Sequence, residues 1–426
     1  MAPSQHDSTG PLTSRLGGWL PVDPRHLNKW LESNIAEAEK RNAPLHPVVR
    51  EFRDMIENDP VMNMYFTLMF EQQPRSAPKP GSGDVKLENY GQMLVVMNHI
   101  LTIAPTFDTT GMVGCPINAI LDYAMITPAG LAAFADTRVN AMLRRLLSAW
   151  SEFLDSEASR YVLNDSPSGW LSPVARESIQ LHEFQIDPNA EFCGFKSWND
   201  FFIRRFKPES RPVARLGDQK AIVNACESQP YRIQTKVKEH DTFWMKSQPY
   251  SLRHMLNGNF VEQFVDGTVY QAFLSAKNYH RWHSPVTGTI RKLQKVPGTY
   301  YAEAASEQFD SAGPTNSQGF IAHVATRALV FIEADYSGIG LMCFIAVGMV
   351  EVSSCVLVDR EGKPLEEGQK VEKGDQLGYF QFGGSTHCLV FRPDVISEFA
   401  TEAIPQGEHG QTSPIVKVNS LLAIAS

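Results

Sequence analysis

The apolar residues of this chain change their spacing part-way along the sequence, and this change limits the folds that it can adopt. In the N-terminal third they recur at helical spacing, as in His26–Lys40 and Pro47–Asn58, which places them on one face of a helix. From Ala221 onward they form short runs between turn residues, such as Ala328–Glu333 and Leu341–Val347, which is typical of strands. The two patterns predict an α+β fold, with a helical N-terminal domain followed by a β-rich domain.

We expect residues 19–160 to form the helical domain. Asp59-Pro60 combines a capping residue with a proline at the first helical position, and it predicts a helix over Val61–Phe70. Further helices are predicted over Tyr90–Ile103 and Pro128–Leu154. The preceding residues 1–18 are polar, so we expect a disordered tail. Four aromatic residues beyond the helical domain are expected to pack on one side of another helix: Trp198, Phe201, Phe202 and Phe206.

Composition and charge argue against several classes of protein. A hydrophobic content of 43% and a charged content of 20% are typical of a soluble globular protein. A net charge of −8 disfavours a nucleic-acid partner or an anionic membrane surface, because both would select a basic face. The longest apolar run, Ile339–Val350, spans 12 residues and is too short to cross a bilayer. We therefore expect no nucleic-acid partner and no stable membrane insertion.

The cysteines and the N-terminal residues indicate a location. Six cysteines are scattered without CxxC spacing, which predicts neither a zinc cluster nor a disulfide framework. The first residues lack the basic-then-apolar pattern of a secretory signal. Reduced thiols and the absence of such a signal favour a cytoplasmic protein.

One short stretch near the C-terminus could carry chemistry of its own. In Gly383–Thr386, two glycines precede a serine, and glycine leaves its own carbonyl open to approach. The Ser385 hydroxyl could attack the carbonyl of Gly384 and convert the peptide bond into an ester. Most strings of this composition are flexible turns, so the stretch needs support from elsewhere in the chain.

That support comes from two further segments that carry titratable side chains. His280 and His283 stand three apart in Tyr279–Pro285, and on a strand such positions face opposite ways, so we expect no shared metal ion. A histidine near a serine can act as its general base, because its ordinary pKa lies near neutrality. Glu227 could hold such a histidine in the right tautomer, or it could be a solvated surface residue.

Together these segments resemble the phosphatidylserine decarboxylase family, whose members cleave themselves to make a pyruvoyl cofactor. Two departures from the family pattern stand out, because Glu227 replaces an aspartate and Gly383 replaces a leucine. With these two residues the chain resembles a soluble fungal branch of the family, which acts on L-tryptophan. Four blocks in the family's order carry the resemblance: Asn199–Pro212, Ala225–Ser228, Tyr279–Pro285 and Gly383–Thr386.

The resemblance implies a role for each candidate residue. Ser385 would attack the Gly384 carbonyl, His283 would remove the serine proton, and Glu227 would orient His283. Ser385 would then become the covalent pyruvoyl cofactor, which serves as an electron sink during loss of CO₂. His280 would protonate the resulting carbanion. Backbone N–H groups near position 386 are the expected donors to the oxyanion.

The resemblance also implies the domain organisation and the reaction. Residues 161–426 would form the pyruvoyl-dependent decarboxylase domain, cut between 384 and 385, and the chains 1–384 and 385–426 would remain associated. The expected reaction converts an aromatic L-amino acid, tryptophan or similar, to the amine and CO₂. Two alternatives stay open: a phosphatidylserine decarboxylase that acts on membrane lipid, and a non-catalytic member that kept the fold. The sequence shows no strong basic amphipathic helix for membrane access, which favours the free amino acid.

Overall fold

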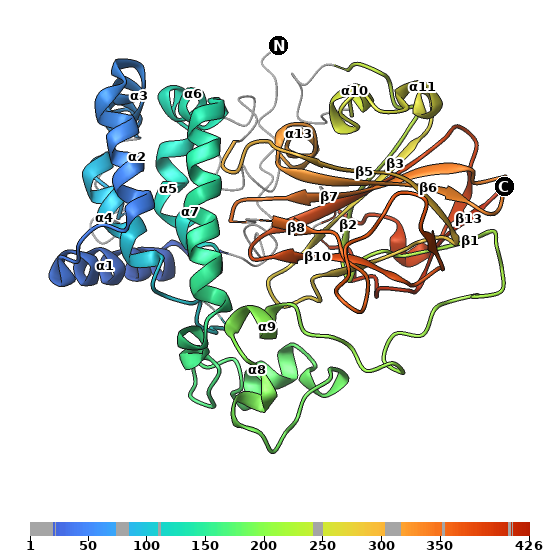
Figure 1. The fold of residues 1–426 in the computed structure, drawn as a ribbon, viewed down its shortest axis with the longest axis horizontal. Coiled ribbons are helices and arrows are strands. Elements are labelled where there is room, and N and C mark those ends of the chain that lie inside the picture. Colours follow the sequence, from blue (N-terminus) through green and yellow to red (C-terminus); the bar gives the residue numbers. More distant parts are fainter. Residues whose placement is uncertain are drawn as a thin grey trace, which may run out of the picture.

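The computed structural model describes residues 20–21, 23–73, 85–109, 112–241, 250–302, 317–351, 354–407, 410 and 412–426. The predicted tail, residues 1–18, lies outside the described residues. The longer helices precede the first strand, and the strands from Ala221 onward have only short helices between them, so the α+β prediction is confirmed (Figure 1). No helix of the described residues is long and apolar enough to cross a membrane.

The N-terminal part is built from helices that mostly begin at a proline. Asp59 caps one of them, because its carboxylate accepts hydrogen bonds from the N–H groups of Val61 and Met62 at 2.9 and 3.1 Å, as predicted. The helices are α1 (Pro24–Arg41), α2 (Pro47–Asn58), α3 (Pro60–Glu71), α4 (Tyr90–Ile100), α5 (Pro116–Met125), α6 (Pro128–Ala135) and α7 (Thr137–Asp155).

Three details differ from the predicted helices. The expected single helix over Pro128–Leu154 is two, because Asp136 adopts an extended conformation and caps α7 by accepting a hydrogen bond from the Arg138 N–H. Helix α5 had no counterpart in the prediction. Phe206 lies outside the short helix α9 (Trp198–Phe202), since it forms an isolated bridge with Phe184 and stacks on that ring at 4.3 Å.

A seven-stranded antiparallel sheet forms the centre of the C-terminal part. Its order is β2 (Gln229–Thr235), β3 (Thr268–Leu274), β11 (Ser385–Phe391), β7 (Leu341–Gly348), β6 (Arg327–Ala334), β5 (Gly288–Val296) and β9 (Lys370–Val371). Two three-stranded sheets accompany it. They are β1 (Ala221–Val223), β13 (Leu421–Ala425) and β12 (Ile396–Phe399), and β4 (Arg281–His283), β10 (Gln376–Gln381) and β8 (Ser354–Val356). The other α-helices of the described residues are short: α8 (Pro173–Ser178), α10 (Leu252–Met255), α11 (Val261–Phe264) and α13 (Gln318–Val324).

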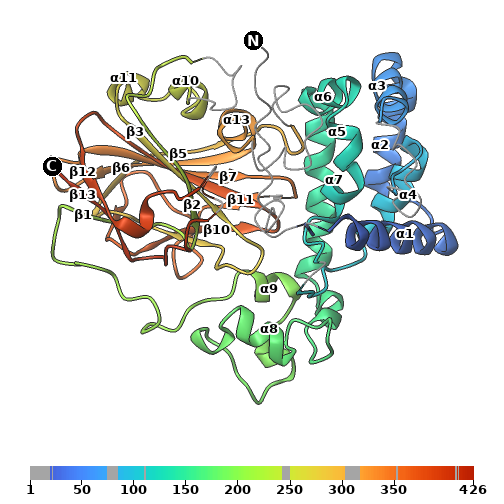
Figure 2. The same ribbon diagram turned by 180° about the vertical axis from the view of Figure 1, so that it is seen from behind.

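Strand β11 is buried along its whole length between β3 and β7. Its side chains alternate between two apolar clusters: Cys388 and Val390 join the cluster that includes the helices, and Leu389 and Phe391 join the other. In Figures 1 and 2, α5, α6 and α7 lie between the sheet and the outer helices α2–α4. The helical layer and the sheet thus share one apolar core, and the boundary expected at residue 160 remains a prediction.

Candidate functional site

Ser385 is the first residue of the central strand β11, and its surroundings suit a nucleophile. The residue is 2% exposed, and its hydroxyl has no hydrogen-bond partner among the described residues. The carbonyl of Gly384, which forms the peptide bond to Ser385, accepts a hydrogen bond from the Met349 N–H at 3.0 Å. Such a donor would stabilise negative charge that develops on this oxygen. Oxyanion donors were expected near Thr386, and that role stays a prediction; the structure adds the Met349 N–H, in the segment that follows β7, as a candidate donor.

The backbone before Ser385 depends on glycine. Gly383 has a φ of +129°, which residues with a side chain rarely adopt. A cavity of about 10 Å³ reaches Ser385 between Phe273 and Gln318, and it is no larger than one water needs. The described residues of the uncleaved chain therefore leave no room for an amino acid at Ser385.

His280 lies in the same neighbourhood as Ser385. Leu274 pairs with Ser385 across β3 and β11, and the chain then runs through a loop to His280. The imidazole is fully buried and stacks on Phe202 at 3.9 Å, and Phe202 in turn packs against Phe382 at 4.9 Å. His280 is thus two ring contacts away from the segment that precedes the Gly384–Ser385 bond.

Burial sets the protonation state of His280. Its pKa lies well below the usual value, because burial disfavours the charged imidazolium and the nearby Arg204 guanidinium repels it. Arg204 also anchors the loop, donating to the carbonyls of Lys277 and Asn278 at 2.8 and 3.2 Å. The ring is therefore neutral at pH 7 and can accept a proton.

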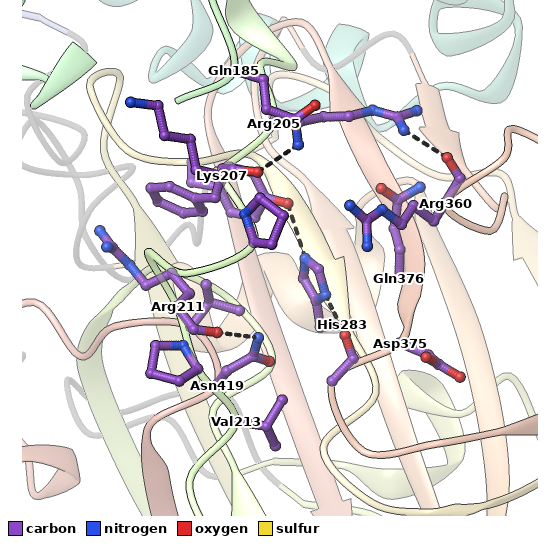
Figure 3. A pocket seen from close by; sticks show the side chains of 16 residues that line it. Gln185, Arg205, Lys207, Arg211, Val213, His283, Arg360, Asp375, Gln376 and Asn419 are labelled. Atoms are coloured by element: carbon purple, nitrogen blue, oxygen red, sulfur yellow. Dashed lines mark hydrogen bonds between the residues drawn. The ribbon is translucent and has the colours of Figure 1, made fainter. Parts of the chain in front are cut away.

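His283 faces a different space. It lines a cleft of about 280 Å³ together with basic side chains, among them Arg205, Lys207 and Arg360 (Figure 3). Its Nδ1 lies 2.7 Å from the Gly374 carbonyl, so this nitrogen must donate, and Nε2 then accepts from the Tyr279 hydroxyl at 2.9 Å. Burial lowers the pKa of His283 to about 4.

Glu227 is engaged by a buried arginine. Its carboxylate accepts hydrogen bonds from Nε and a terminal nitrogen of Arg211 at 3.0 and 2.7 Å, and from the Val418 N–H at 2.9 Å. A guanidinium binds a carboxylate at two points, which makes a stronger contact than a single imidazole N–H. The contacts that the structure describes for these residues therefore do not link Glu227 to His283, or His283 to Ser385. The relay through these three residues stays a prediction.

The sequence analysis did not identify two groups that the structure brings to the candidate residues. Met349 acts through its backbone N–H, and a backbone group leaves no signal in residue type. Arg211 lies in the aromatic-basic block Asn199–Pro212, so the sequence could have indicated that it matters. The sequence could not have indicated that Arg211 pairs with Glu227. Among the described residues, no group of three or more acidic, histidine or cysteine side chains is arranged to hold a metal ion.

Comparison with known proteins places this chain in a family. A family model described as phosphatidylserine decarboxylase matches residues 198–418, more than half of the chain, and a second model with that description matches residues 46–179. The chain belongs to the phosphatidylserine decarboxylase family. The two matches cover helices α2–α7 and most of the strands, so the family assignment rests on most of the fold.

Individual relatives within the family are decarboxylases. The chain is 42% identical to decarboxylase iboD of Amanita muscaria, over 73% of this chain and 91% of that protein. It is 34% identical to an L-tryptophan decarboxylase of Psilocybe cubensis, over 97% of this chain and 95% of the relative. A phosphatidylserine decarboxylase proenzyme of Schizosaccharomyces pombe is 32% identical over 53% of this chain but only 22% of its own length.

The family uses a pyruvoyl group, and the residues at position 385 suit its formation. Three features fit: a serine hydroxyl without a partner, an adjacent glycine carbonyl that already accepts an N–H, and a glycine in a conformation that admits close approach.

The pairing of Glu227 can be tested by double-mutant cycles in a Ser385→Ala background, which removes any effect of cleavage. Arg211→Met and Glu227→Gln should be coupled by about 1–3 kcal/mol in urea unfolding, because they share a buried ion pair. His283→Ala and Glu227→Gln should combine additively. A coupling between Glu227 and His283 that exceeds the coupling with Arg211 would contradict the observed pairing.

Proposed function

We propose that this chain cleaves itself between Gly384 and Ser385 and, through the pyruvoyl group formed at position 385, decarboxylates an aromatic L-amino acid such as tryptophan. The observation that carries the proposal is the Gly384 carbonyl: it bonds to the Met349 N–H and stands next to a buried serine hydroxyl without a partner. In this proposal the Ser385 hydroxyl is the nucleophile and the adjacent Gly384 carbonyl is the electrophile. The Met349 N–H, just after β7, is the oxyanion donor.

Self-cleavage would proceed on the residues of the chain itself. Ser385 Oγ attacks the Gly384 carbonyl carbon, its proton goes to a base, and the Met349 N–H stabilises the oxyanion. The C–N bond then breaks with protonation of the Ser385 nitrogen, which leaves an ester. Removal of the Ser385 Cα proton expels the Gly384 carboxylate and leaves a dehydroalanine. Water converts this residue to the pyruvoyl group and ammonia.

Two histidines are candidates for the base. The resemblance assigns this role to His283 and assigns protonation of the product carbanion to His280. The ring contacts favour His280 as the imidazole nearer the scissile bond. The pyruvoyl group supplies the electron sink for loss of CO₂, and the chain must supply the proton that follows.

The extent of the similarity supports an amino acid as substrate. The match to the L-tryptophan decarboxylase covers 97% of this chain and so extends over the helical layer. The match to the Schizosaccharomyces proenzyme covers about half of this chain. All six cysteines are free and buried, which supports a reducing location such as the cytoplasm.

Strand pairing supports continued association of the two chains after cleavage. Both ladders begin at Ser385, but residues 386–391 also pair with β3 on one side and β7 on the other, and these pairs lie beyond the Gly384–Ser385 bond. The chains 1–384 and 385–426 should therefore co-elute on gel filtration and separate only in denaturant.

The first test is cleavage itself. Purified protein should resolve into two chains by intact mass, the smaller of about 4.7 kDa by its share of the 47.6 kDa total. Ser385→Ala should stay uncleaved, folded and inactive, because it removes only the hydroxyl. A full-length protein that is active, or decarboxylation by uncleaved Ser385→Ala, would contradict the pyruvoyl mechanism.

The second test separates the histidines by time-resolved gels. On the assigned roles, His283→Ala should slow cleavage by about 10²–10⁴-fold, the usual contribution of a positioned base. Glu227→Gln should slow it less, and His280→Ala should cleave but lose most decarboxylase activity. Slow cleavage by His280→Ala with normal cleavage by His283→Ala would reverse the roles. Normal cleavage by both variants would exclude both histidines as the base.

The third test identifies the substrate. Cleaved protein should release CO₂ and the amine from L-tryptophan, and it should leave phosphatidylserine vesicles unchanged. Ser385→Ala is the matched control for background decarboxylation. Turnover of the vesicles without turnover of any amino acid would favour the lipid reaction, and cleaved protein without either activity would favour a non-catalytic member.

A further inference from the structure

A buried carboxyl group lies where the helical layer meets the Gly384–Ser385 bond. Glu351 follows β7, is 1% exposed, and accepts a hydrogen bond from the Asn118 N–H in the first turn of α5 at 2.7 Å. The Cys115 thiol, at the start of the same helix, lies within hydrogen-bonding reach of both the Glu351 carboxyl and the Gly384 backbone. Met349, two residues before Glu351, donates to the Gly384 carbonyl.

Helix α7 contacts the same segment from another direction. Trp150 packs edge-on against Phe382 with ring centroids 5.0 Å apart. At the end of the helix, Asp155 accepts a hydrogen bond from the Gln381 side chain at 2.7 Å. The helical layer therefore contacts residues 381, 382 and 384, directly before the nucleophile.

We propose that the helical layer positions the scissile bond for self-cleavage, and that Glu351 is the positioning residue that holds the Met349 N–H and Gly384 in register through Asn118 and Cys115. This inference rests on the proposed self-cleavage. It gives the helical layer a function in maturation, whichever substrate the mature enzyme takes.

The geometry implies that the charged form of Glu351 does the positioning. A carboxylate accepts the Asn118 N–H and the Cys115 thiol proton, and the N-terminus of α5 favours negative charge. A protonated carboxyl is a weaker acceptor and loses the attraction to the helix. The scissile bond should therefore be held best when Glu351 is ionised.

Glu351 changes its ionisation state at a pH that a cleavage experiment can reach. Burial raises its pKa to about 7, although the Asn118 N–H and Cys115 oppose this shift. The titratable groups that face it among the described residues are Cys115 and Tyr301, and burial raises the pKa of each well above its usual value. The pKa of His280 lies well below its usual value and that of His283 is about 4, so neither titrates near pH 7.

The same ionisation has a cost for the folded state. The pKa of Glu351 is higher in the folded chain than in the unfolded one, so the unfolded chain loses this proton first as pH rises. Folded stability contributed by this group therefore falls between about pH 4.5 and pH 7. Ionised Glu351 therefore lowers the stability of the folded chain, so its proposed contribution is to position the scissile bond and not to stabilise the fold.

The experiment follows cleavage of chains made by cell-free synthesis and transferred to buffers from pH 5.5 to 8.5. Wild-type cleavage should accelerate through about pH 7. Glu351→Gln should cleave roughly 10- to 100-fold more slowly at pH 8, as expected for a misplaced reacting group, and should lose the inflection. Cys115→Ala should slow cleavage while it keeps the inflection. Glu361→Gln, at an exposed turn, is the matched control and should behave as wild type.

Thermal melts in the Ser385→Ala background separate positioning from simple stabilisation. Adding Glu351→Gln should not lower the melting temperature at pH 8, because it removes the cost of a buried charge. Should that variant fail to fold, Cys115→Ala and the wild-type pH profile decide the matter. The inference would be overturned if Glu351→Gln cleaved at the wild-type rate with an unchanged inflection. It would also be overturned if Glu351→Gln failed to fold, Cys115→Ala cleaved normally and the wild-type profile had no inflection. Neither outcome would affect the proposed function. A wild-type chain that never cleaves would overturn the proposed function instead.

Discussion

The hydrogen bond from the Met349 N–H to the Gly384 carbonyl holds the backbone directly before Ser385 in position. It joins the end of β7 to the start of β11, and strand register then sets Ser385 opposite Leu274 and Gly348. Because β3 and β7 pair with β11 along residues 386–391, the proposed cut before Ser385 would leave the sheet in place. The proposed scissile bond therefore lies next to a well-paired strand.

Burial affects both candidate histidines in the same way, although only His280 has ring contacts that lead toward this bond. Burial keeps His280 and His283 neutral at physiological pH, so either can accept a proton, but a low pKa also makes each a weak base. Under the proposed function, the base of self-cleavage acts once in each molecule, so a slow proton transfer is tolerable in that step. The residue that protonates the carbanion acts in every turnover, so this tolerance does not extend to it.

Sequence patterns predicted the elements better than the contacts between them. The capping role of Asp59 depends on adjacent residues, so its helix start could be predicted. Asp136 offered the same local signal for the break between α6 and α7, and helical spacing on both sides concealed it. The partner of Glu227 could not be derived in this way, because Arg211 and His283 both lay within the resembling blocks and only tertiary packing selects between them.

The two buried carboxylates show how environment divides similar groups between tasks. Glu227 lies against the guanidinium of Arg211, which compensates its charge and ties Val418 to the same centre. Glu351 has backbone N–H groups and a thiol around it, with no cation among the contacts described for it, so burial leaves its charge only partly compensated. The first arrangement suits a fixed structural link. The second suits a contact whose strength changes near neutral pH, and it stands where the helices reach the bond before Ser385.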